Sequence, residues 1–185
     1  MTSIAAKAFS GMNALETLNL PASLKTVGSD GTWFGEMFVN VSNTGTPQAT
    51  PAKLTAVNVA EGGSTYSSAD GVVYSADAST LIYCPAVKTS IKFSDKTTAI
   101  DKYAFYKSSI EKMQLPDSLE SIGKMAFMNS SVRYLEFPGT MKTIDQEAFF
   151  NAQLRSVDLN EGLETIGDRA FSVSHVVGIT IPASV

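Results

Sequence analysis

The chain has 185 residues, of which 44% are hydrophobic and 17% are charged, and its formal net charge is −4. These values suit one folded domain or array with a real core, and the acidic balance provides no basic field to neutralise nucleic-acid phosphates. One cysteine and one histidine exclude an internal disulfide and a zinc site of clustered Cys and His ligands. No apolar run approaches the roughly 18 residues of a membrane span, so we expect no membrane insertion of this segment.

A six-residue pattern, Ile-x-x-x-Ala-Phe, recurs along the chain. One copy begins at Ile4, and four more begin 22 residues apart from one another, at Ile100, Ile122, Ile144 and Ile166. A fixed period of this length is typical of solenoids, in which one repeat cannot bury its apolar surface alone and must stack on its neighbours. A bundle of long helices is the competing interpretation, but proline and glycine in each period exclude it.

A second pattern, L-x-x-L-x-L, runs between the Ala-Phe pairs. Its last apolar residues alternate with polar ones, which is the period of a half-buried strand, and proline follows it at Pro21, Pro116, Pro138 and Pro182. We therefore expect a leucine-rich-repeat, right-handed solenoid with a parallel β-sheet on one face and short helical or 3₁₀ turns on the other. The phenylalanine rings should stack into a spine opposite the strands, and the alanines should let neighbouring coils approach closely.

The middle of the chain departs from this regularity. Residues 54–87 are expected to form one strand and then a β-hairpin insertion, because the runs 72–74 and 80–83 are β-branched and aromatic and flank a short polar loop. The tyrosines of this insertion are expected to pack over the edge of the sheet. Residues 29–53 are irregular, and aromatic residues within them could replace an Ala-Phe pair; these are Trp33, Phe34 and Phe38.

These motifs resemble the BspA-like leucine-rich repeats, whose copies read L-x-x-L-x-L-P-x-x-L-x-x-I-G-x-x-A-F. The resemblance is direct in residues 1–28, the first repeat, and 88–185, the regular 22-residue repeats, so the whole chain is expected to be one solenoid segment. Met12 stands where cysteine is common in the family. Both ends of the chain fall inside a repeat, which favours a slice of a longer protein whose export signal lies outside this segment.

The resemblance implies a function without catalysis or a cofactor. It suggests a recognition or adhesion module of a secreted or cell-surface protein, which binds a protein or glycan partner on a host or neighbouring cell. Two other functions stay open at this point. The chain could be a structural spacer that projects another domain, or an accessory domain of a carbohydrate-active surface protein.

The residues that could carry catalysis are few. Cys84 and His175 lie near strands four coils apart, about 19 Å at the spacing of paired strands, so they predict no Cys-His dyad. The carboxylates of Glu136 and Asp158 could lie about 5 Å apart on adjacent strands, the separation that retaining glycosidases use. The alternative for this pair is two solvated carboxylates on an open face.

The predicted binding surface is the strand face of the solenoid. Polar residues between the apolar ones of each strand should point away from the core and form columns down the sheet. Tyr134 is the one aromatic residue near the centre of these columns, and with Arg133 it is the candidate hot spot, since aromatic and arginine side chains favour protein contacts. An ordinary solvated sheet face is the alternative. The candidate residues are Lys92, Lys112, Gln114, Arg133, Tyr134, Glu136, Arg155 and Asp158.

Overall fold

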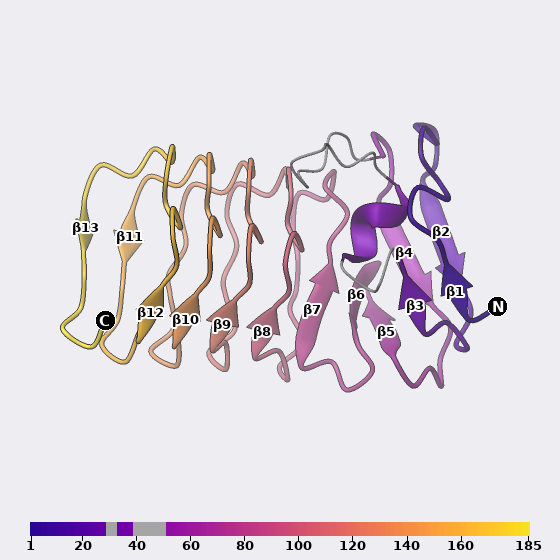
Figure 1. Cartoon of the computed structure of the whole chain (residues 1–185), viewed down its shortest axis with the longest axis horizontal. Helices are drawn as coiled ribbons and strands as arrows, with labels where there is room; N and C mark the ends of the chain where they lie inside the picture. Colours follow the sequence, from indigo (N-terminus) through magenta and orange to yellow (C-terminus); the bar gives the residue numbers. More distant parts are fainter. Residues whose placement is uncertain (29–32, 39–50) are drawn as a thin grey trace.

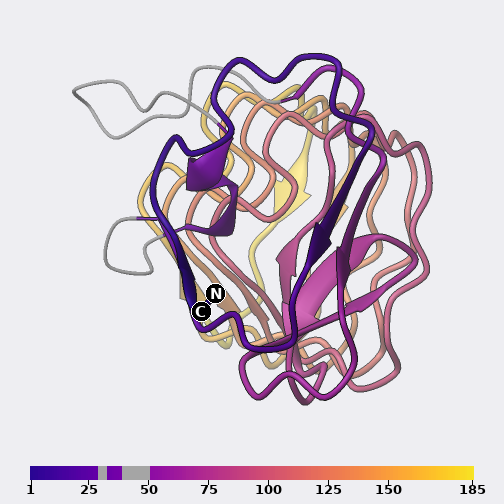
Figure 2. The same cartoon turned by 90° about the vertical axis from the view of Figure 1, so that its right-hand side faces the viewer.

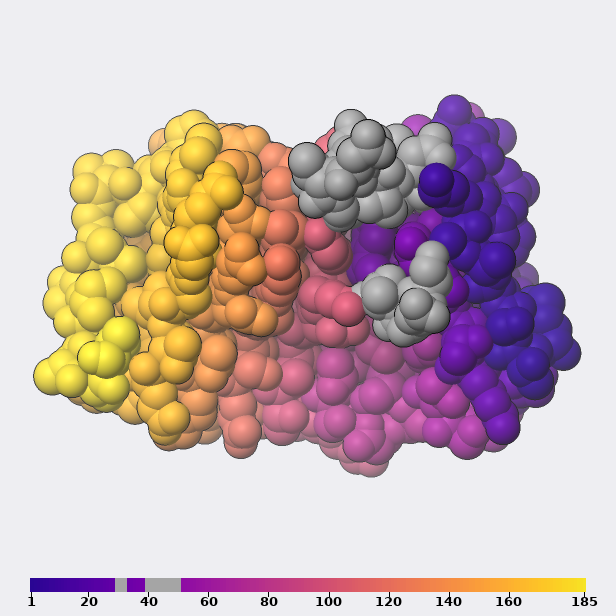
Figure 3. Space-filling model, viewed as in Figure 1, coloured from indigo at the N-terminus to yellow at the C-terminus, as the bar shows by residue number. Residues whose placement is uncertain are grey.

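The computed structural model describes residues 1–28, 33–38 and 51–185, and it shows a solenoid of stacked coils. The coils follow one another along the longest axis, with the two termini at opposite ends (Figure 1). Seen along that axis they superimpose around a common interior (Figure 2), and in the space-filling view they form successive bands (Figure 3). The predicted leucine-rich-repeat solenoid with a hairpin insertion is confirmed, with differences in where its sheets and turns lie.

The longest sheet includes the two-residue strands that end at the isoleucine of each of the four regular Ile-x-x-x-Ala-Phe patterns. Thr143 and Ile144 pair in parallel with residues 121–122 of the preceding coil and 165–166 of the next. We call this sheet the Thr-Ile sheet. Its strands, in sheet order, are β12 (Thr165–Ile166), β10 (Thr143–Ile144), β9 (Ser121–Ile122), β8 (Ala99–Ile100), β7 (Thr80–Tyr83), β6 (Val72–Ser75) and β5 (Tyr66–Ala69). At the N-terminal end β1 (Ser3–Ile4) and β3 (Thr26–Val27) form a separate parallel pair.

The L-x-x-L-x-L segments lie on another side of the coil and pair less completely. We call this side the L-x-L face; it consists of segments 17–20, 56–59, 88–95, 110–117, 132–137, 154–159 and 176–181. Strand β2 (Thr17–Leu20) pairs with β4 (Ala56–Val59), and β11 (Val157–Asp158) pairs with β13 (Ile179–Thr180), all in parallel. Between these pairs only single bridges join Lys112, Tyr134 and Ser156. The solenoid therefore has two strand faces, where the sequence predicted one.

The predicted phenylalanine spine forms the interior. The rings of Phe105, Phe127 and Phe149 are fully buried, and with Phe171 they stack in nearly parallel planes. Successive ring centroids are 4.8, 5.0 and 5.3 Å apart, which matches the spacing of paired strands because each ring rides on its own coil. Ala104, Ala126 and Ala148 beside them are completely buried, as expected for residues at which neighbouring coils touch.

The Ala-Phe segments are hydrogen-bonded turns and not helices. Each coil carries residues in the left-handed region here, such as Tyr103 (φ 58°) and Lys107 (φ 55°), and a left-handed residue interrupts any right-handed helix. Single turns remain, closed for example by the bond from Ser108 N–H to the Phe105 carbonyl. The described residues contain one 3₁₀ helix, η1 (Phe34–Met37), and no helix that could cross a membrane.

The η1 segment stands where the second coil needs its Ala-Phe turn. Lys7 and Phe9 donate their backbone N–H groups to the carbonyls of Glu36 and Met37, as Tyr103 and Phe105 of a regular coil donate to the next coil. The Phe38 ring then lies 6.2 Å from that of Phe9. Trp33, Phe34 and Phe38 are all buried, so the aromatic replacement suggested by the sequence is present. The rest of the irregular segment, 29–32 and 39–50, lies outside the described residues.

The insertion divides the interior of the solenoid in two. Strand β6 is antiparallel to both β5 and β7 and is buried on both of its sides. Val72 and Tyr74 belong to the C-terminal core with the phenylalanine spine, whereas Val73 faces the N-terminal core around Trp33. Tyr74 and Tyr83 are only 1% and 3% exposed, so these two tyrosines lie in the interior and not over a sheet edge as expected. The strand passes through the core, where alternate side chains meet two different apolar surroundings.

Candidate functional site

The predicted residues lie in register on the L-x-L face. Lys112, Tyr134 and Ser156 form one bridged row across three coils, which puts Gln114 and Glu136 side by side in the next row. The side chain of Tyr134 is 52% exposed, whereas its neighbour Leu135 is buried. Seven of the eight candidates are exposed and Arg133 is half-buried. The alternation of apolar and polar residues therefore placed these side chains correctly on the outer surface.

A hollow of about 550 Å³ lies around Tyr134. We call it the Tyr134 hollow. Ile91, Met113 and Leu135 supply apolar surface in it, and charged and amide groups surround them. Its full lining is Ser90, Ile91, Lys112, Met113, Gln114, Tyr134, Leu135, Glu136 and Ser156. Four of the eight predicted residues thus meet in one depression.

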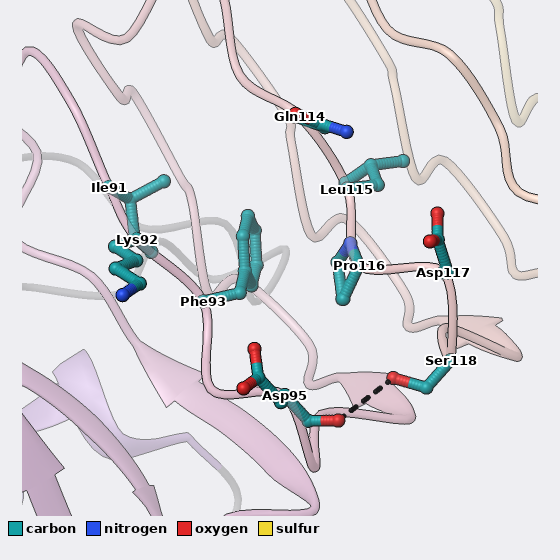
Figure 4. A pocket seen from close by; sticks show the side chains of 9 residues that line it. All are labelled: Ile91, Lys92, Phe93, Asp95, Gln114, Leu115, Pro116, Asp117 and Ser118. Carbon is teal, nitrogen blue, oxygen red and sulfur yellow. Dashed lines mark hydrogen bonds between the residues drawn. The ribbon is translucent and has the colours of Figure 1, made fainter.

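A second hollow of about 460 Å³ adjoins the first and shares Ile91 and Gln114 with it. In this Phe93 hollow the ring of Phe93 lies between two neighbouring chain segments (Figure 4). The lining residues are Ile91, Lys92, Phe93, Asp95, Gln114, Leu115, Pro116, Asp117 and Ser118. Together the two hollows form one depression, which we call the groove.

The groove contains acidic residues that the sequence reasoning missed. Asp95 and Asp117 line the Phe93 hollow, and Ser118 Oγ donates hydrogen bonds to the carbonyls of Asp95 (3.4 Å) and Thr97 (2.8 Å). Asp117 follows the proline that ends its strand, so it lay outside the strand columns from which the candidates were chosen. Its equivalence to Asp95 one coil earlier, 22 residues away, is the regularity that could have found the pair.

The groove exists because two successive coils separate on this face. Arg133 N–H donates to the Glu111 carbonyl and Arg155 N–H to the Arg133 carbonyl, but within the described chain no such bond joins Glu111 to Thr89. The backbone of 89–93 makes no hydrogen bond to any other described backbone group. Just before the two segments the coils are still joined, since Ser109 N–H donates to the Ala86 carbonyl at 2.7 Å.

Lys88 provides a physical reason for this separation. It occupies the position at which the following coils carry the buried apolar residues Ile110, Val132 and Leu154. Its Nζ instead donates to the carbonyl of Asp70 at 2.8 Å and lies 3.3 Å from the Asp70 carboxylate. Asp70 is at the tip of the β5–β6 hairpin, so this contact ties the start of the 88–95 segment to the insertion.

Three predicted residues do not line the groove. The guanidinium of Arg133 lies 3.5 Å from the carboxylate of Glu111 in the preceding coil, and this ion pair holds the side chain there. Arg155 and Asp158 are exposed further toward the C-terminal end. Of the suggested hot spot, therefore, the structure brings Tyr134 into the groove and leaves Arg133 outside it.

Of the residues considered for catalysis, Cys84 is buried, whereas His175, Glu136 and Asp158 are exposed. The Cys84 thiol is buried, and burial raises its pKa to about 12, which keeps it protonated and unreactive at neutral pH. His175 is exposed, with its Nδ1 3.4 Å from the Ala152 carbonyl. Glu136 and Asp158 are both exposed. Glu136 lines the Tyr134 hollow, and Asp158 does not. Among residues 1–28, 33–38 and 51–185, no three His, Cys, Asp or Glu side chains form a group that could hold a metal ion.

A coil repeated at 22-residue intervals, a continuous phenylalanine spine and an outward-facing row of polar strand residues together define a leucine-rich-repeat protein. The sequence pattern described as BspA type leucine rich repeat region matches residues 1–34 and 79–185, in six copies. The chain belongs to this family, as the resemblance of its motifs indicated.

Solved structures agree with this assignment. The pneumococcal vaccine antigen PcpA is 29% identical with a TM-score of 0.73, over 92% of this chain and 39% of that one. A leucine rich cell surface protein from Faecalibacterium prausnitzii A2-165 is 28% identical with a TM-score of 0.75, over 100% of this chain and 46% of that one. This chain therefore spans less than half the length of either. A leucine-rich repeat protein from Bacteroides ovatus ATCC 8483, at 17% identity and a TM-score of 0.51, shares the fold. No curated protein matches the chain.

Proposed function

We propose that this chain is a non-enzymatic recognition module of a secreted or cell-surface protein, and that it binds a protein or glycan partner through the L-x-L face. The observation that carries the proposal is the groove around Tyr134. An aromatic side chain that is half exposed, set among apolar surface with polar groups at the rim, is the composition of a binding hot spot.

The relatives support the location. One solved structure similar to this chain is described as a cell surface protein and another as a vaccine antigen. The weakly charged composition and the exposed polar rows suit a surface that meets partners outside the cell. Lys112, Gln114 and Glu136 would give the contact its polarity, because each presents a different charge to the same groove.

The proposal is tested by binding of the purified chain to immobilised matrix proteins and to a glycan array. We expect Tyr134→Ala to weaken binding about tenfold or more, because loss of a central aromatic anchor typically costs about 2 kcal/mol or more. Thr165→Ala is the control, since Thr165 is also exposed but belongs to the Thr-Ile sheet. Its binding should equal that of the unmodified chain.

Other results would contradict the proposal. If binding is unchanged in Tyr134→Ala and lost in Thr165→Ala, the contact lies on the Thr-Ile sheet. If the unmodified chain binds none of the surfaces, the function of a structural spacer that projects another domain is favoured instead.

A further inference from the structure

We infer that the groove accepts an extended peptide strand that carries an acidic residue toward one end and a basic residue toward the other. This inference rests on the proposed function and names the class of partner. In the following coils a backbone hydrogen bond joins each segment to the one before it, from Arg133 to Glu111 and from Arg155 to Arg133, but no such bond joins the two described segments at the groove. Unpaired donors and acceptors on extended chain are a template for an added strand.

The unpaired groups form a continuous stretch. Thr89 to Phe93 make no backbone hydrogen bonds to other described backbone groups, and Glu111 N–H lacks the bond that its equivalents Arg133 and Arg155 make to the preceding coil. Both segments are held at their ends, where Ser109 bonds Ala86 and Ser118 bonds Asp95. The unpaired backbone is therefore fixed in place before any ligand arrives, which lowers the entropy lost on binding.

The charges of the groove select the ligand's charges. Lys92 and Lys112 each precede an aspartate of the same segment, since Asp95 and Asp117 follow them by three and five residues, and Glu136 is a third carboxylate at the groove. At about 3.3 Å per extended residue, the Lys-to-Asp separation is roughly 10 Å along the first segment and 16 Å along the second. A peptide with opposite charges four residues apart, about 13 Å, falls between these two values.

The apolar floor fits the side chains between those charges. Phe93 and Leu115 are 9% and 3% exposed, and Ile91 is half-buried although its equivalents in the next three coils are buried. Because alternate residues of a strand point to the same side, β-branched residues on either side of a central polar one would contact this floor. A glycan has no row of alternating amide donors and acceptors to match the unpaired backbone, so the geometry favours a peptide.

The experiment follows the amide NMR signals of the ¹⁵N-labelled chain during titration with capped peptides. The probe is Ser-Glu-Val-Thr-Val-Lys-Ser, and its neutral form carries Gln in place of Glu and Lys. A third peptide has both Val residues replaced by Pro, which removes two N–H donors. We expect the probe to shift the amides of residues 89–93 and 111, to bind several-fold tighter than the neutral peptide, and the Pro peptide to cause no shifts.

Variants separate the two contributions. Asp95→Asn combined with Asp117→Asn should weaken binding of the charged probe, because the peptide's lysine loses its acidic partners, and should leave the neutral peptide's affinity unchanged. Binding of the Pro peptide as tightly as the probe, or shifts confined to other parts of the chain, would overturn the inference. If no peptide binds while matrix or glycan binding is lost in Tyr134→Ala, the recognition function stands and the peptide inference is wrong. If a glycan alone shifts the amides of 89–93, the groove is a sugar site and the inference is equally wrong.

Discussion

At the scale of single residues, the turns depend on a backbone conformation that the sequence pattern does not reveal. Two positions in each regular coil are left-handed, and unrelated residues occupy them. The first position is held by Tyr103, Met125, Glu147 and Arg169, and the second by Lys107, Asn129, Asn151 and Val173. Asparagine tolerates this conformation and a β-branched residue is disfavoured in it, so the backbone at Val173 is more strained than at Asn129 and Asn151.

Replacement of Val173 by asparagine is expected to stabilise the protein. Val173 is at φ 60° and its side chain is 62% exposed, so the substitution removes backbone strain without loss of core packing. We expect the free energy of unfolding to rise by about 1 kcal/mol, measured by urea denaturation. Val177→Asn is the control, because Val177 is exposed but is not among the left-handed residues, and its effect should stay within about 0.5 kcal/mol. A loss of stability in Val173→Asn would contradict the argument.

The same scale shows what could be predicted of the site. Tyr134, Lys112 and Gln114 were found because their apolar neighbours in the sequence specify which side of the strand faces outward. Asp95 and Asp117 were missed because they follow the strands, where no alternation orients a side chain. Their position in the groove depends on how far neighbouring coils separate.

At the scale of elements, the position directly after the isoleucine of each regular coil is aspartate in one coil and glycine in the next. Asp101 and Asp145 accept a hydrogen bond from the following backbone N–H, at 2.8 and 2.6 Å. Gly123 and Gly167 hold the same position in the intervening coils and lie against these turns. The glycine has no Cβ atom, so its backbone can lie against the aspartate turn of the preceding coil. This close approach lets the Thr-Ile sheet keep its strand spacing.

Gly167→Ala is expected to destabilise the protein by this close approach. A Cβ atom at Gly167 would lie 2.6 Å from the Asp145 carbonyl carbon and closer still to the Gln146 nitrogen, and these are backbone atoms that cannot turn aside. We expect the free energy of unfolding to fall by about 1 to 3 kcal/mol, as for other overpacked sites. Gly178→Ala is the control, since nothing lies within 4 Å of its added Cβ. Equal thermal unfolding midpoints of the two variants would show that the coils can separate without cost.

At the scale of the whole molecule, stability passes from coil to coil. The Phe127 ring contacts Phe105 on one side and Phe149 on the other, at 4.8 and 5.0 Å, but no ring contact joins Phe105 to Phe149. Energetic coupling should therefore be strong between neighbours and weak between second neighbours, as in a one-dimensional array.

Double-mutant cycles on the spine test this. We expect Phe105→Leu and Phe127→Leu to show an interaction energy of about 0.5 to 1.5 kcal/mol, the additional energy of a stacked aromatic pair. The cycle of Phe105→Leu with Phe149→Leu is the matched control and should be additive within about 0.5 kcal/mol. The measurement is the free energy of unfolding in urea. Equal coupling in the two cycles would mean that the spine responds as one rigid unit.

The sequence by itself determined the repeat, its period and the residues that face inward. Each coil must place apolar residues at the same positions to fill the shared interior. The apolar pattern therefore recurs in each coil, and comparison of the copies reveals it. The hairpin strands at 72–74 and 80–83 were also predicted, because β-branched and aromatic residues on both sides of a polar loop carry that information locally.

Only the tertiary structure decided the path of the hairpin through the molecule and the position of the groove beside it. That β6 passes through the interior, that Asp70 at the hairpin tip meets Lys88, and that the 89–93 backbone is left unpaired are contacts between segments without a common repeat. No periodicity relates such segments, and the free energy of their contacts depends on positions that the rest of the fold imposes. The repeats could therefore be predicted from the sequence. The groove could not, because it forms where the repeat is interrupted.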